Sequence, residues 1–87
     1  MKFTGNDLKR TRTFLRLSQT DFARLIGSKQ RTVSKAEQSN HYVSGELNNK
    51  VNKGLKEQGI DPETLFVLIV EVEEVLKKKF GLRNQDK

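Results

Sequence analysis

Apolar residues recur along the first 60 positions at spacings of three and four, the period of amphipathic helices. Thr4, with Asp7 three residues later, is typical of a capping box and predicts a helix over about residues 5–16. Ser18 can cap a second helix, whose apolar face ends at Gly27, a residue suited to a left-handed C-terminal position. The chain therefore begins with two short helices.

A third helix, which Ser28 can cap, reaches about residue 38 and has only Val33 and Ala36 to bury. We expect it to be short and mostly exposed to solvent. After a loop rich in turn formers, Ser44 can cap a fourth helix. Its apolar residues follow at four-residue spacing: Leu47, Val51 and Leu55.

The last long pattern begins at Asp61 and Pro62, which suit the cap and first turn of a helix over about residues 62–80. Its main apolar stripe consists of Leu65, Leu68, Ile69, Val72, Leu76 and Phe80. We expect this stripe to complete the core of the monomer against the first and fourth helices. A strand stays open as an alternative for part of the β-branched run at residues 65–72. Residues 82–87 are predicted to be a disordered tail, and the fold class is all-α.

Positive charge is concentrated in one half of the chain. The net charge is +6, and residues 1–38 carry nine basic side chains against three acidic ones, whereas residues 39–87 carry eight of each. A one-sided basic field is typical of proteins that bind polyanions, because each Lys or Arg that neutralises a phosphate releases counterions. Charge alone leaves nucleic acid, acidic proteins and anionic membranes open as partners.

Other chemistries find little support in the composition. With no cysteine and a single histidine, His41, the chain has neither a disulfide framework nor the ligands of a zinc site. It shows no nucleophilic triad, phosphate-binding glycine loop or metal cluster, so we expect no enzyme activity and no cofactor. The longest apolar run, residues 65–70, is too short to cross a bilayer, and the N-terminus lacks a secretory signal. We expect a cytoplasmic protein that does not bind membranes.

Residues 18–37, SQTDFARLIGSKQRTVSKAE, meet the steric needs of two helices that cross closely. Ala23 is small where the helices meet, Gly27 tolerates positive φ in the turn, and Val33 is an apolar anchor that faces back. With Val33 inside, the polar residues of the third helix face outward, where base edges would be read.

The stretch LSQTDFARLIGSKQRTVSKAE resembles the Cro- and lambda-repressor-like helix-turn-helix family, also called the XRE family. The family pattern has a Ser-Gln helix start, Ala four residues later, Gly four after that, then Val-Ser and Glu. The likeness covers roughly residues 4–58 and implies a lambda-repressor-like DNA-binding domain over residues 1–60. Ala36 and Ser39 depart from the family, which usually has a large apolar residue and a glycine there. Residues 61–81 have no counterpart in the family and are predicted to be an extra, fifth helix.

The resemblance implies that Arg12 forms a structural ion pair with Glu37 and that Gln19 clamps a phosphate of double-stranded DNA. Gln30 suits the edge of an adenine and Arg31 that of a guanine. The complete predicted DNA-binding set is Gln19, Ser28, Lys29, Gln30, Arg31, Thr32, Ser34, Lys35, Asn40 and His41.

These observations predict a homodimeric transcriptional regulator of phage, plasmid or bacterial type, a repressor that occupies an operator. We place the dimer interface on Phe66, Val67 and Val70, because they lie off the stripe that the monomer's own core requires. The alternative is an antitoxin-like interaction module, whose C-terminal helix binds a partner protein while the helix-turn-helix autoregulates its operon.

Overall fold

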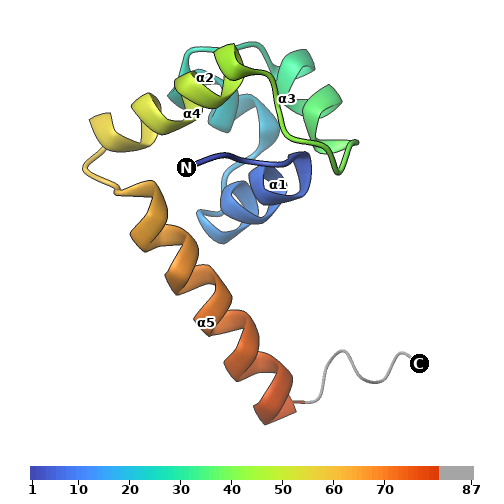
Figure 1. The fold of residues 1–87 in the computed structure, drawn as a ribbon, viewed down its shortest axis with the longest axis vertical. Helices are drawn as coiled ribbons and strands as arrows, with labels where there is room; N and C mark the ends of the chain where they lie inside the picture. Colours follow the sequence, from blue (N-terminus) through green and yellow to red (C-terminus); the bar gives the residue numbers. More distant parts are fainter. Residues whose placement is uncertain (81–87) are drawn as a thin grey trace.

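Five α-helices make up residues 1–80, the part of the chain that the computed structural model describes (Figure 1). They are α1 (Gly5–Phe14), α2 (Gln19–Ile26), α3 (Gln30–Glu37), α4 (Gly45–Glu57) and α5 (Pro62–Phe80). The only β pairing within residues 1–80 is an isolated bridge between Thr4 and Tyr42. The all-α prediction is confirmed, and the run predicted as a possible strand is helical. The predicted tail, residues 82–87, lies outside the described residues.

Local signals set the helix starts. At α1 the Thr4 hydroxyl accepts from the Asp7 N–H at 3.0 Å, and the Asp7 carboxylate accepts from the Thr4 N–H at 3.0 Å, which completes the expected capping box. The helix ends at Phe14 rather than at residue 16, because Arg16 adopts a left-handed backbone with φ of 60°.

The turn between α2 and α3 differs from the prediction by one residue. Gly27 is left-handed, with φ of 72°, and the Ser28 N–H donates to the Ala23 carbonyl at 2.8 Å, so Ser28 belongs to the end of α2. Lys29 is the N-cap of α3, and its side chain makes no capping hydrogen bond. The predicted Ser28 cap is therefore wrong, and α3 begins without side-chain capping.

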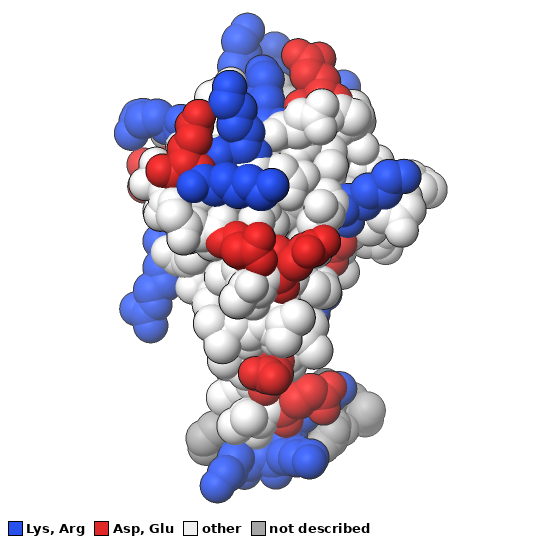
Figure 2. Space-filling model, turned by 60° about the vertical axis from the view of Figure 1, so that its left-hand side comes forward, with Lys and Arg blue, Asp and Glu red and all other residues white. Residues whose placement is uncertain are grey.

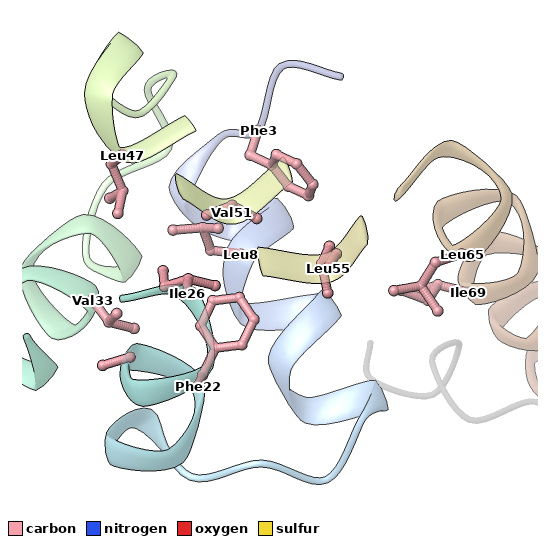
Figure 3. Packing of buried hydrophobic residues seen from close by; sticks show 11 residues of the cluster. Phe3, Leu8, Phe22, Ile26, Val33, Leu47, Val51, Leu55, Leu65 and Ile69 are labelled. Atoms are coloured by element: carbon pink, nitrogen blue, oxygen red, sulfur yellow. The ribbon is translucent and has the colours of Figure 1, made fainter. Parts of the chain in front are cut away.

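One core joins all five helices to the segment before α1 (Figure 3). Its fully buried side chains include Phe3, Leu8, Phe22, Val33 and Val51. Val33 is the only buried residue of α3, as its sequence predicts. In Figure 3, Leu65 and Ile69 of α5 point toward Leu55 of α4. The core thus holds α3 by one anchor and α5 by its first half.

Most of α5 projects away from the domain formed by α1–α4 (Figure 1). Leu65 and Ile69 are buried, but Leu68, Val72 and Leu76 are 47%, 38% and 39% exposed. The prediction that the whole apolar stripe completes the monomer's core is therefore wrong. The helix diverges from the domain, so only residues on its inner side contact α1 and α4.

A polar contact fixes the direction of α5. The Arg10 guanidinium on α1 donates to both carboxylate oxygens of Glu73, at 2.6 and 3.1 Å, and lies 5.1 Å from the centre of the Phe66 ring. The hydrogen bond and charge of Glu73 raise the pKa of Arg10 above its usual value, against an opposing effect of burial. Phe66 and Glu73 therefore belong to the inner side of α5.

Candidate nucleic-acid interface

Helix α3 presents nearly all of its polar side chains to solvent. Gln30, Arg31, Thr32 and Lys35 are exposed, and Ser34 is half-buried. With a single buried anchor, the helix needs polar contacts to hold its orientation against α1 and α2.

The strongest of these contacts joins α1 to the last residue of α3. Arg12 donates from Nε and Nη2 to the two carboxylate oxygens of Glu37, at 2.7 and 3.0 Å, and from Nη1 to the Leu17 carbonyl at 2.9 Å. The side chains are only 13% and 3% exposed. This is a bidentate pair almost removed from water, and every nitrogen of the guanidinium has a partner.

Ionisation of the pair follows from these contacts. Burial raises the pKa of Glu37, but the hydrogen bonds from Arg12 and Gln19, with the charges of Arg12 and Lys9, outweigh it and lower the pKa below its ordinary value. The Glu37 hydrogen bond correspondingly raises the pKa of Arg12. The pair is charged at neutral pH.

Gln19 extends this contact to the outer surface of α3. Its Nε2 donates to Glu37 Oε1 at 3.0 Å, and its Oε1 accepts from Gln30 Nε2 at 2.8 Å. A hydrogen-bonded chain therefore runs from buried Arg12 through Glu37 and Gln19 to exposed Gln30. The sequence carries no local signal for the contact between Gln19 and Gln30, since it joins residues 11 positions apart on two helices. The phosphate contact assigned to Gln19 stays a prediction.

The loop after α3 borders the same surface. His41 donates its N–H to Ser39 Oγ at 2.9 Å, and its carbonyl accepts from the Gly5 N–H at 3.1 Å, so Ser39 shapes the turn and the loop is tied to α1. Asn40 and His41 are exposed. A shallow hollow of about 410 Å³ separates the loop from α3 and is lined in part by Arg31, Lys35, His41 and Tyr42.

A second hollow of about 400 Å³ lies on the other side of Thr32, between the α2–α3 turn and the start of α4. Ser28, Lys29 and Thr32 line it together with Lys50, which the sequence analysis missed. Thr32 also lines the first hollow, so the two hollows adjoin. Of the predicted residues they bring together Ser28, Lys29, Arg31, Thr32, Lys35 and His41.

The sequence analysis also left Tyr42 and Lys2 out of the predicted site. Tyr42 is 67% exposed, and the Lys2 ammonium lies 5.7 Å from the centre of its ring. A lone tyrosine in a turn-rich loop is the only signal that the sequence offers for this pair.

Figure 2 shows Lys and Arg side chains over the upper part of the molecule, formed by α1–α4, and again at the lower end of α5. Acidic side chains and an uncharged stretch lie between them.

The basic residues of the outer α3 surface are Lys29, Arg31 and Lys35, and none of them takes part in an ion pair within residues 1–80.

The residues assigned to a dimer contact do not share one environment. Phe66 is half-buried beside Arg10, whereas Val67 and Val70 are 57% and 36% exposed.

Within the described chain no cluster of three or more His, Cys, Asp or Glu side chains could hold a metal ion. Among the described helices none has the length and apolar character needed to span a bilayer.

No family model, curated protein or solved structure matches the chain, so any function proposed for it rests on its own residues and geometry.

Proposed function

We propose that this protein is a sequence-specific, double-stranded DNA-binding regulator of the XRE type, with α2 and α3 as its helix-turn-helix. The observation that carries the proposal is an exposed basic helix with one buried anchor, whose outward Gln30 is oriented by a chain of hydrogen bonds from the buried Arg12–Glu37 pair. An α-helix with its side chains is about 10–12 Å across, which fits the ~12 Å width of the DNA major groove.

Two kinds of contact follow from this surface. Gln30 and Arg31, at the start of α3, read base edges, since amide and guanidinium groups match adenine and guanine. Lys29, Lys35 and Lys50 lie around them and contact phosphates, which fixes the position of the domain without reading sequence. Occupying an operator as a homodimer would then repress transcription by excluding polymerase.

We expect salt-sensitive binding to duplex sites selected from random DNA. If about six phosphates are neutralised, the logarithm of the association constant should fall against the logarithm of salt concentration with a slope of roughly −5 per bound unit. Fluorescence anisotropy at several salt concentrations measures this slope. Failure to enrich any site, together with a slope near zero, would refute the DNA-binding proposal.

Single substitutions on α3 should change sequence preference. Gln30→Ala and Arg31→Ala are each expected to cost about 1–3 kcal/mol against the preferred base and to relax the selected site at one or two base pairs. Lys9→Ala, at an exposed position of α1, is the control and should weaken all sequences alike. Unchanged site preference in both α3 variants would place the reading surface elsewhere.

An antitoxin-like module is the second candidate, favoured by the exposed apolar residues of α5. In that case a different protein covers α5, and the helix-turn-helix binds the operon's own DNA. Mass measurement of the purified chain separates the candidates, because the repressor forms a homodimer by itself.

A further inference from the structure

Helix α5 carries an uncovered apolar seam that borders the line of its buried residues and continues past them toward the end of the helix. Leu68, Val72 and Val75 are 47%, 38% and 53% exposed, and Leu76 beside them is 39% exposed. The first three recur at spacings of four and three, the repeat that places side chains along one line of contact between two helices. Leu65 and Ile69, by contrast, reach the domain's core.

The seam lies on a different side of α5 from the predicted dimer residues. At about 100° per residue, Val67 and Val70 point about 100° and 160° away from Leu68 around the helix axis. Val67 and Val70 do not form part of a longer apolar stripe. They were predicted as dimer residues because the stripe was assigned to the monomer's core, but Leu68, Val72 and Leu76 of that stripe are exposed and free for a dimer contact. Leu68, Val72, Val75 and Leu76, with Glu71, line a continuous hollow of about 260 Å³ along the helix.

Charges beside the seam decide how a second helix can lie on it. Glu71 and Lys78 are seven residues apart, so they occupy the same edge of the seam. Neither takes part in an ion pair within residues 1–80. Along α5 as a whole, acidic residues precede Lys77, Lys78 and Lys79, and Figure 2 shows basic side chains gathered at its lower end.

We propose that two copies of this chain pair through this seam with their α5 helices antiparallel. The two-fold axis passes between Val72 and Val75, so that Val72 of each copy packs against Val75 of the other. Glu71 of one copy then lies beside Lys78 of the second, and symmetry repeats this attractive pair. Lys79 lies opposite Leu68 of the second copy, where its alkyl chain covers the leucine while its ammonium reaches water.

A parallel pair lacks this complementarity. It would set Glu71 across from the opposite edge of the second helix, beside Leu76 and away from Lys78, and it would bring the three lysines at residues 77–79 of both copies together, which is repulsive. The antiparallel arrangement separates the lysine clusters to opposite ends and removes the apolar seam from water. It deepens the homodimer part of the proposed function, but it needs no DNA, so the two can fail separately.

The first test is the mass of the full-length chain by sedimentation equilibrium in DNA-free buffer. We expect wild type to reach twice its 10.0 kDa chain mass as concentration rises. Val72→Glu should raise the dimer dissociation constant about 100-fold or more, because symmetry buries two new charges. Val67→Glu, the same change at a more exposed valine off the seam, should leave the dissociation constant unchanged. Since both valines face solvent in the monomer, circular dichroism should show an intact fold.

A charge exchange then tests the orientation. Glu71→Lys and Lys78→Glu should each weaken the dimer about tenfold, and the double variant should restore it, because the exchanged pairs attract again. A wild-type monomer at every concentration would overturn the proposal, as would dissociation by Val67→Glu in place of Val72→Glu. Single charge variants that behave as wild type would indicate a parallel pair and also overturn it.

Discussion

Replacing Arg12 with alanine is expected to lower the free energy of unfolding by about 3–5 kcal/mol. The change leaves the Glu37 carboxylate, whose side chain is 3% exposed, without its bidentate partner. It also removes the donor to the Leu17 carbonyl. Urea denaturation at pH 7, followed by circular dichroism, measures the loss.

Arg10→Ala is the matched control. Arg10 forms a bidentate pair of similar geometry with Glu73, but those side chains are 32% and 45% exposed, so water screens the charges. We expect it to cost about 1 kcal/mol. Equal losses in the two variants would contradict the view that the buried pair is what holds the end of α3.

The same pair predicts acid sensitivity. Because folding lowers the pKa of Glu37, its carboxylate contributes stability that is fully present above the ordinary value of 4.5 and is lost as pH falls through the lowered value. Hydrogen bonds from Thr64 lower the pKa of Asp61 as well, so wild type alone does not isolate Glu37. Glu37→Gln should therefore lose less stability than wild type between pH 5 and about pH 3, and equal losses would contradict the assignment.

Gly5→Ala is expected to destabilise the protein by about 3 kcal/mol, against the usual preference of helices for alanine. A Cβ at Gly5, the first residue of α1, would overlap the carbonyl oxygens of Ala36 and Ser39 at the end of α3. Both are backbone atoms, so no rotation of a side chain relieves the overlap, and the two segments must separate. Chemical denaturation of the purified variants measures the change.

Gly45→Ala is the control, because Gly45 is the first residue of α4 and a Cβ there meets nothing within 4 Å. It should be neutral or stabilising by up to about 1 kcal/mol. If both glycine variants behave alike, the close approach of α1 to the end of α3 is not required for stability. If only Gly5→Ala also weakens DNA binding at temperatures where it stays folded, that approach sets the orientation of the proposed recognition helix.

Local chemistry accounts for what the sequence predicted well. The capping box at Thr4, the left-handed Gly27 and the buried Val33 depend on neighbours within a few residues or on the helical period, and both can be read along one chain. The cap predicted at Ser28 and the helix end predicted at residue 16 were wrong for local reasons too. They depend on backbone angles that several residue types can adopt, so residue type alone does not predict them. The ion pair between Arg12 and Glu37 was predicted only from the family resemblance, because no residue close to either one in the sequence indicates that they are partners.

By itself, then, the sequence determined five helices, their approximate limits and the concentration of basic side chains in the first half. Only the tertiary structure decided that Gln19 holds Gln30, that Lys50 and Tyr42 border the outer surface of α3, and that much of the apolar stripe of α5 stays outside the core. The last point has a simple physical reason. An apolar stripe has the same period whether it packs in the monomer's core or against a second protein. The direction in which the chain leaves the turn at Gly59 decides which of these two surfaces the stripe of α5 meets.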